Sequence, residues 1–325
     1  MKNGIVVIGT VFVDIKGFPF NTYIPAGRNA GTVETVHGGV GRNVAEDIAN
    51  LELRPSFMSL VDDSAQGEEV LRKLKNHKVN TEYVLSCPDG MGIWLAVFDE
   101  TGDVAGSISK RPAMEPLMGL LEEKGDEIFS QCDSVVIEID LEKELVKQVL
   151  HYAKKHGKKV FAVVANMSIA SQRRDLLQQI DCFVCNDQEA GILFADDFSS
   201  LSQEEMCDEI STRVMNAKIP AMVVTMGAKG SVYADANGQK GICPANKVAV
   251  RDTTGAGDAF CAGVAAGLTY GQDLRGAVAI GTRLAASVIT VSENVCPRFL
   301  PEELGLNRDY TEAKHLFFGD EDLQK

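Results

Sequence analysis

The sequence predicts an α/β fold in which a mainly parallel sheet carries helices on both faces. Short apolar runs rich in Val and Ile alternate along the chain with segments whose apolar residues recur at helical spacing. Several of the apolar runs are continuous, as strands buried on both faces are. The alternation extends over most of the 325 residues. It is typical of a three-layer fold whose parallel strands are joined by helices.

The expected elements follow this rhythm along the chain. Strands are expected at residues 4–9, 56–61, 92–98, 134–139, 159–164, 182–185 and 221–225. Helices are expected at residues 42–51, 66–76, 141–155 and 203–217. The last third, from 258 to 291, is rich in Ala and Gly with few helix breakers, so packed helices are expected there.

Two stretches, at 11–36 and 88–110, interrupt the rhythm with Gly, Thr and aromatic residues. Both are expected to form strands of a small accessory sheet. Each follows a core strand or turn, where α/β folds place their binding crevice, so a lid is expected. The chain 1–325 is therefore interpreted as a single domain with lid insertions at about 11–36 and 88–112. The polar tail after Glu302 is expected to be a peripheral helix with a frayed end.

The composition excludes several classes of partner. Lys and Arg number 32 against 46 Asp and Glu, which gives a net charge of −14. This charge argues against nucleic acid and anionic membranes as main partners, although a local site can still bind a small anion. The apolar run at 5–13 is too short to span a bilayer and is followed by no signal-peptide cleavage site, so a cytoplasmic location is expected.

The cysteines are expected to be buried thiols. The sequence contains 8 of them, and its one CxxC pattern, Cys182 and Cys185, lies inside an apolar run. A redox or zinc pair needs a second set of ligands or a turn that leads into a helix. Thiols packed as small apolar side chains are the favoured interpretation.

The segment 251–260, RDTTGAGDAF, carries the strongest chemical signal. Gly255 and Gly257 allow tight turns and close approach of the backbone to a ligand. A helix is expected to begin near Asp258, and its first N–H groups would attract an anion above the Gly-Ala-Gly turn. A carboxylate beside such a hole is suited to act as a general base for a hydroxyl that attacks phosphorus. The alternative is that Asp258 merely caps the helix.

A second glycine motif, HGGVGRNVA at 37–45, leads into another expected helix. Gly38 and Gly39 would let a polyhydroxylated ligand touch the backbone, and Asn43 offers both a donor and an acceptor to hydroxyl groups. The pattern superficially begins a dinucleotide-binding fingerprint. Val44 stands where the third glycine is needed, so the dehydrogenase interpretation is disfavoured.

Two further segments follow expected strands. Asn186 and Glu189, three residues apart on a first helical turn, suit outer-shell contact with a magnesium-bound phosphate, because Mg²⁺ keeps its waters. A helix N-cap with an acidic first turn explains them equally well. Thr225, Gly227 and Gly230 lie in a glycine-rich turn that could approach nucleotide phosphates or simply form a hairpin.

Two aspartates end strands of the expected sheet. Asp14 follows the first strand and could accept hydrogen bonds from sugar hydroxyls at the crevice. Asp140 ends a middle strand and has the same possible role in substrate binding. An ordinary surface aspartate is the alternative for both.

The motifs at 38–45 and 252–260, together with Asn186-x-x-Glu189 and the turn at 225–230, resemble the signatures of the ribokinase-like (PfkB) carbohydrate kinases. The resemblance extends from about residue 4 to about residue 300, and the motifs occur in the family's order. It implies a ribokinase-like three-layer sandwich with a small β-sheet lid. It also implies an ATP-dependent kinase that uses Mg²⁺, and a homodimer formed through the lid.

The resemblance also implies roles for individual residues. Asp258 would be the catalytic base, and the N–H groups of Gly255, Ala256 and Gly257 would form the anion hole. The sugar would be held by Asp14, Gly38, Gly39 and Asn43. Asn186 and Glu189 would organise magnesium and phosphates, Glu189 through water, and Thr225, Gly227 and Gly230 would line the nucleotide site. Asp252 and Thr254 match a monovalent-cation site that would take K⁺, but the later loop at 290–297 is not typical of ribokinase.

Within the family, the segments 14–17, 38–51 and 288–297 resemble pseudouridine kinases and related nucleoside kinases. The sequence analysis therefore favours transfer of the γ-phosphoryl group of ATP to a primary hydroxyl of pseudouridine or a similar ribosyl compound. The alternative is a kinase for a free sugar such as ribose, fructose or 2-keto-3-deoxygluconate. A different class, a binding or regulatory protein that has lost catalysis, would have a broken Asp258 motif, and the motif is intact.

Overall fold

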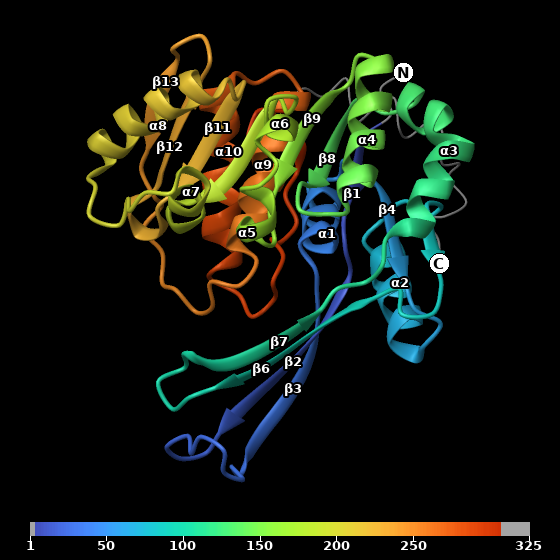
Figure 1. Cartoon of the computed structure of the whole chain (residues 1–325), viewed down its shortest axis with the longest axis vertical. Helices are drawn as coiled ribbons and strands as arrows, with labels where there is room; N and C mark the ends of the chain where they lie inside the picture. The colour runs from blue at the N-terminus through green and yellow to red at the C-terminus, as the bar shows by residue number, and fades with distance from the viewer. Residues whose placement is uncertain (1–3, 307–325) are drawn as a thin grey trace.

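A nine-stranded sheet forms the centre of the molecule (Figure 1). The computed structural model describes residues 4–306. Across the sheet the strands follow in the order β13 (Lys240–Cys243), β12 (Ser231–Asp235), β11 (Ala221–Thr225), β10 (Cys182–Asn186), β9 (Lys159–Val163), β8 (Ser134–Glu138), β1 (Ile5–Ile8), β4 (Ser56–Val61) and β5 (Val84–Ser86). The pairs from β11 to β5 are parallel, whereas β12 and β13 join one edge in antiparallel orientation.

Helices cover both faces of this sheet, as the sequence predicts. One face carries α1 (Val40–Asn50), α2 (Ala65–Asn76), α9 (Ala256–Thr269) and α10 (Leu274–Val288). The other carries α3 (Glu115–Ser130), α4 (Lys143–Lys155), α5 (Met167–Ala170), α6 (Arg174–Leu177), α7 (Asp187–Phe194) and α8 (Gln203–Ala217). Successive residues of β1 alternate between the two cores: Ile5 and Val7 pack with the first helix layer, Val6 and Ile8 with the second.

A second sheet projects from this body (Figure 1). Its strands follow in the order β3 (Gly31–Gly38), β2 (Phe12–Pro19), β6 (Gly92–Phe98) and β7 (Val104–Lys110). We call these four strands the small sheet. It is drawn from the two stretches in which the sequence predicts accessory strands. That it closes over a substrate stays a prediction.

The site is positioned by a reversal in the order of the strands. From β1 the chain proceeds to β4 and β5 on one side, and it then returns to β8 and continues to β11 on the other. In open α/β sheets, ligands bind outside the carboxyl ends of the strands at such a switch point. The ends of β1 and β8 therefore mark the place where a ligand site is expected.

Individual elements agree with the sequence prediction or add to it. The strand expected at 92–98 is β6 of the small sheet, as its place within the accessory stretch 88–110 predicts. β5, β13, α3, α5 and α6 were not predicted. The helical region expected at 258–291 is two helices, separated at Gly271, whose φ of 97° interrupts a right-handed helix. The expected peripheral tail lies largely outside the described residues.

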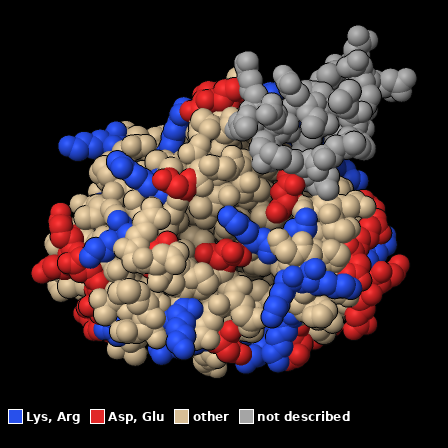
Figure 2. All heavy atoms as spheres, turned by 90° about the horizontal axis from the view of Figure 1, so that it is seen from above, with Lys and Arg blue, Asp and Glu red and all other residues tan. Residues whose placement is uncertain are grey.

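Two expectations from composition can be compared with the structure. Within residues 4–306, the helices include none that is long and apolar enough to cross a membrane. On the face viewed in Figure 2, acidic and basic side chains are interspersed.

Cys182 and Cys185 are buried, free thiols in β10, and burial raises the pKa of both. The interpretation of this pair as packed thiols is confirmed.

Candidate functional site

The carboxyl group of Asp258 lies in the first turn of α9. Gly255, with a φ of 82°, occupies the N-cap position, and Asp258 is the third helical residue. The alternative that Asp258 itself caps the helix is therefore wrong. The first N–H groups of a helix lack partners within the helix, and its dipole favours an anion there.

Asn43 holds the Asp258 side chain from a neighbouring helix. Its Nδ2 donates a hydrogen bond of 2.6 Å to Oδ2 of Asp258. Burial raises the pKa of Asp258 from 3.8 to about 7, although the Asn43 hydrogen bond and the positive charge of Arg42 oppose the shift. A carboxyl group whose pKa lies near neutrality can accept a proton during a reaction at that pH.

The two glycines of the α9 turn have different surroundings. A Cβ atom on Gly255 would lie 2.1 Å from the backbone oxygen of Asn294, so no side chain fits there. A Cβ on Gly257 would meet nothing within 4 Å, which leaves the space above the helix end open. Ala256 N–H donates weakly, over 3.3 Å, to the Thr253 carbonyl. The open space beside these N–H groups can accept a phosphoryl group.

Gly38 and Gly39 lie in close contact with the Asp14 side chain and the Thr10 carbonyl, and neither position has space for a Cβ atom. A Cβ on Gly38 would lie 2.4 Å from Oδ2 of Asp14, and one on Gly39 would lie 2.4 Å from the Thr10 carbonyl. Gly39 also has a φ of 100°. Their close packing brings Asp14, on β2 of the small sheet, to the start of α1. Burial raises the pKa of Asp14, while Lys16 and Arg42 lower it.

Glu138, at the end of β8, is a site residue that the sequence analysis missed. Its side chain is fully buried and Oε1 accepts hydrogen bonds from the backbone N–H groups of Thr10, at 2.7 Å, and Gly41, at 2.6 Å. Burial, together with the charge of Asp140, raises its pKa to about 8. Glu138 thus joins the end of β1 to the start of α1. A carboxylate inside a buried apolar strand was the signal that could have identified it.

Asp140 is buried, so the surface alternative for this residue is wrong. Its Oδ2 lies 2.6 Å from Nη1 of Arg111, which directly follows the small sheet. Its two oxygens also accept backbone hydrogen bonds of 3.0 Å from Ala165 and Asn166. Asp140 therefore connects the base of the small sheet to the strand ends. These contacts favour a structural role, and its role in substrate binding stays a prediction.

Arg42 and Asn294 connect the start of α1 to the α9 turn. The fully buried Arg42 guanidinium lies 3.5 Å from Oδ1 of Asn294 and donates to the carbonyls of His37 and Gly38. Asn294 Nδ2 donates to the His37 carbonyl over 3.0 Å. Since the Asn294 backbone also packs on Gly255, the loop at 290–297 contacts both glycine motifs.

Asn186 and Glu189 form a capping box at the start of α7. Asn186 Oδ1 accepts from Glu189 N–H, and Glu189 Oε2 accepts from Asn186 N–H, both over 2.8 Å. The helix-cap interpretation is therefore confirmed. Burial raises the pKa of Glu189, and the charges of Asp140 and Asp187 raise it further, although the Asn186 N–H opposes them. A divalent cation would offset this clustered negative charge, and the oxygen donors suit Mg²⁺.

The glycine-rich turn lies next to this capping box, because Thr225 pairs with Asn186 across β10 and β11. The turn leads through η1 (Gly227–Lys229) into β12, so it forms the hairpin that was one of its two interpretations. Gly227 and Gly230 have φ angles of 54° and 93°. Both glycines adopt backbone conformations that other residues rarely adopt.

Asp252 and Thr254 lie in the segment before α9 and are exposed. Asp252 Oδ1 accepts a hydrogen bond of 2.8 Å from Thr254 N–H. One oxygen of this carboxylate is thus already engaged locally. The K⁺ site expected here stays a prediction.

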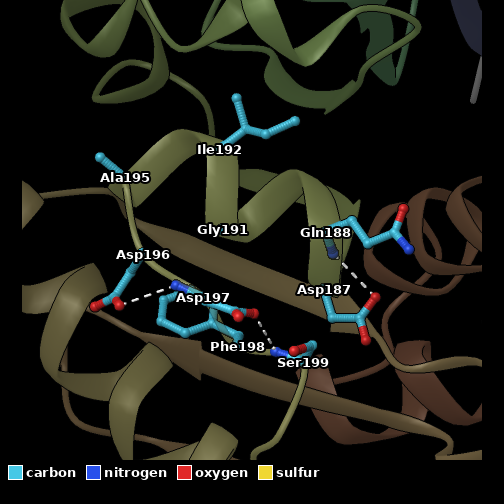
Figure 3. Close-up of a pocket in the computed structure, with 9 residues that line it drawn as sticks. All are labelled: Asp187, Gln188, Gly191, Ile192, Ala195, Asp196, Asp197, Phe198 and Ser199. Carbon is cyan, nitrogen blue, oxygen red and sulfur yellow. Dashed lines mark hydrogen bonds between the residues drawn. The ribbon is translucent and has the colours of Figure 1, made fainter.

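A surface hollow of about 670 Å³ lies elsewhere on α7 (Figure 3). It is lined on the helix by residues that include Gln188, Gly191 and Ile192, and beyond the helix by the loop that contains Asp196 and Asp197. Hydrogen bonds from the backbone of Asp197 to Asp196 and of Ser199 to Asp197 order this loop. None of the predicted site residues lines this hollow, so it is separate from the candidate site around Asp258.

Known proteins share both the sequence and the fold. The family profile described as pfkB family carbohydrate kinase matches residues 2–296. The chain belongs to the pfkB family. Its enzymatic class is that of phosphotransferases acting on a hydroxyl group, and the family prediction is confirmed.

Individual relatives of this pfkB kinase differ in their named substrates. The chain is 36% identical to the guanosine-inosine kinase of Exiguobacterium acetylicum over 294 aligned residues. The alignment covers 90% of this chain and 96% of the relative. The chain is 25% identical over 279 residues to the pseudouridine kinase of Escherichia coli (strain K12), which covers 84% of this chain and 88% of that one.

Solved structures show the same fold. Arabidopsis thaliana ribokinase complexed with ribose and ATP superimposes with a TM-score of 0.82 at 22% identity, covering 94% of this chain and 99% of the other. Adenosine kinase from Sinorhizobium meliloti gives a TM-score of 0.72 at 20% identity, with 98% and 100% covered. The predicted ribokinase-like fold, with its large sheet and second small sheet, is confirmed.

Proposed function

We propose that this pfkB kinase transfers the γ-phosphoryl group of ATP to the primary hydroxyl of a purine ribonucleoside. The observation that carries the proposal is the Asp258 carboxyl group. It lies at the start of α9 beside open space, is held by Asn43 and has a pKa near neutrality. This arrangement supplies a base and an anion-binding helix end at one place.

In this proposal each group has one task. The N–H groups of Gly255, Ala256 and Gly257 hold the transferred phosphoryl group, and Asp258 accepts the proton of the attacking hydroxyl. Asp14, Gly38, Gly39 and Asn43 position the ribose. Asn186 and Glu189 would hold Mg²⁺ through water, where the cation neutralises charge on the phosphates. Thr225, Gly227 and Gly230 line the nucleotide side.

The purine preference is supported by similarity. The relative named for guanosine and inosine shares 36% of aligned residues, whereas the relative named for pseudouridine shares 25%. Pseudouridine, which the sequence analysis favours, is the second candidate, and a free sugar such as ribose is the third. Because ATP and nucleosides are cytoplasmic metabolites, we place the enzyme in the cytoplasm.

A substrate panel tests the proposal. Guanosine, inosine, pseudouridine, ribose and fructose are each incubated with ATP and Mg²⁺, and ADP release and the phosphorylated product are measured. We expect the highest kcat/KM with guanosine or inosine, and the phosphate on the primary hydroxyl. A higher kcat/KM with ribose or pseudouridine would refute the purine assignment. The Asp258→Asn variant controls for contaminating kinases.

We also propose that a second copy of the chain covers the outer face of the small sheet. On the face opposite Asp14, the strand register places Val33, Leu95 and Ile108, which are 72%, 43% and 70% exposed. Such exposed apolar side chains on three strands of one sheet face are suited to burial in an interface. The matching face of an identical chain would be complementary in its apolar character.

Light scattering after size exclusion tests this assembly. We expect a dimer for the unaltered protein and a monomer for the Leu95→Lys/Ile108→Lys variant. Lys75→Glu, on the exposed surface of α2, serves as the charge-change control and should remain dimeric. A monomeric unaltered protein at micromolar concentration would refute the dimer.

A further inference from the structure

We propose that Trp94 stacks on the nucleobase of the acceptor and so favours nucleosides over free sugars. The inference deepens the proposed function and rests on it. Trp94 lies in β6 and is the single tryptophan of the sequence. None of the motifs that mark the site includes it.

The strand register places Trp94 directly beside Asp14. β2 and β6 run parallel, and Asp14 pairs with Trp94 on one side and with Val36 of β3 on the other. Paired residues project from the same face of a sheet, and neighbouring strands are about 4.8 Å apart. Trp94 therefore shares a face with the Asp14 carboxyl group, one strand away.

This face of the small sheet is turned toward Asp258 and the start of α1. The Asp14 carboxylate lies against Gly38 at the start of α1, and its charge acts on Asp258. Trp94 is half-buried, whereas its neighbours along the strand, Ile93 and Leu95, are 38% and 43% exposed on the opposite face. The alternation separates the two faces of β6 clearly.

Two aromatic side chains continue from the Trp94 indole along the same face of the small sheet. The rings of Trp94 and Phe98 meet edge to face, with centroids 6.3 Å apart and planes at 90°. Phe98 in turn stacks on Phe18, with centroids 4.7 Å apart. The indole thus begins an aromatic row that starts beside Asp14 and proceeds toward the tip of the small sheet.

The connectivity of a ribonucleoside matches this arrangement. If the primary hydroxyl faces Asp258 and the vicinal secondary hydroxyls face Asp14, the base is attached to the carbon next to that diol. The base then lies about one strand spacing from Asp14, where Trp94 is located. Stacking on an aromatic side chain strengthens binding of a base on the order of tenfold or more, and ribose has no such group.

The inference has to be separated from a purely structural role of Trp94 within the small sheet. A structural role would weaken the use of guanosine and ribose equally. It would also make Trp94→Leu and Phe98→Leu equivalent, since both remove the same ring–ring contact. Stacking on the base instead changes the ratio between the two substrates, and Trp94→Phe should preserve that ratio.

Fluorescence and kinetics test the inference on the full chain. Because Trp94 is the single tryptophan, its emission reports on this one position. We expect guanosine, without ATP, to quench the emission in a saturable manner, and ribose to quench it much less. We expect Trp94→Leu to lower the ratio of kcat/KM for guanosine to that for ribose about tenfold. Phe98→Leu should keep the ratio within about twofold.

The possible results distinguish this inference from the proposed function. Turnover of guanosine with unchanged emission, or an equal loss for both substrates in Trp94→Leu, would overturn the role of Trp94 and leave the nucleoside kinase proposal standing. Turnover of free sugars alone, without guanosine quenching, would overturn both.

Discussion

Nδ2 of Asn43 donates a 2.6 Å hydrogen bond to Oδ2 of Asp258, which joins the first turns of α1 and α9 across 215 residues of sequence. The bond links the two glycine motifs through their polar side chains. It favours the ionised form of Asp258 against the effect of burial. The contact therefore lowers the pH at which Asp258 accepts a proton, below the value that burial alone would give.

Replacement of Asp258 by Asn should abolish most of the turnover. We expect kcat to fall by about two orders of magnitude or more, because the amide cannot accept the hydroxyl proton. Binding of ATP, measured by calorimetry, should change little, since the backbone N–H groups remain. Turnover within a few-fold of the unaltered enzyme would show that Asp258 is not the base.

The pH profile should show the ionisation of Asp258. Its pKa of about 7 means that kcat/KM declines as the pH falls through that value. Asn43→Ala removes a hydrogen bond that lowers this pKa, so the decline should move to higher pH, with a loss on the order of tenfold at neutral pH. An unchanged profile in the variant would contradict the coupling.

Gly255→Ala and Gly257→Ala form a matched pair in one turn. Gly255→Ala should destabilise the fold by about 2 kcal/mol, because its φ is 82° and a Cβ would meet the Asn294 carbonyl. Gly257→Ala should leave the melting temperature unchanged or slightly higher, since its Cβ meets no protein atom. We still expect kcat to fall about tenfold or more in Gly257→Ala, because the methyl group occupies space needed by the phosphoryl group. Full activity of a stable Gly257→Ala enzyme would place the anion elsewhere.

Glu138 should make folding stability depend on pH. Its pKa is raised from 4.5 to about 8, so the protonated form is favoured in the folded chain. The stabilisation is complete below pH 4.5 and is lost as the pH rises through about 8. Glu138→Gln cannot ionise, so its free energy of unfolding relative to the unaltered protein should increase over this interval. Denaturant unfolding at several pH values measures the difference, and parallel curves would contradict the shift.

The sequence predicts most of the central fold for a local reason. The strands at 56–61 and 221–225 and the helix at 203–217 coincide with β4, β11 and α8, because apolar periodicity directly records which faces are buried. The place of 92–98 in an accessory sheet is also predicted, because Gly, Thr and aromatic residues of the stretch 88–110 interrupt the strand–helix rhythm. Which face of this strand is exposed could not be predicted, because the residues of β6 are apolar on both faces and only their partners in the small sheet distinguish the two.

Among the site residues, Asp258 and the glycines could be identified because a helix end and a tight turn are local features. For Glu138 the sequence carries only the signal of a carboxylate in a buried strand, and its role depends on Thr10 and Gly41, which are distant in sequence. Asp140 could not be distinguished from a surface aspartate until Arg111 was placed beside it. In each case the missing information was a partner from another part of the chain.

The residue pattern alone therefore predicted the α/β class and a helix end near Asp258, and it gave a capping pair at Asn186 as one of two interpretations, because each depends on neighbours within a few positions. The tertiary structure decided which of these features meet. Close approach of Gly9 and Gly41 lets α1 pack against the end of β1, and packing of α1 on α9 brings Asn43 to Asp258. Such contacts depend on the fit of surfaces that lie far apart in sequence, and periodicity and spacing carry no information about that fit.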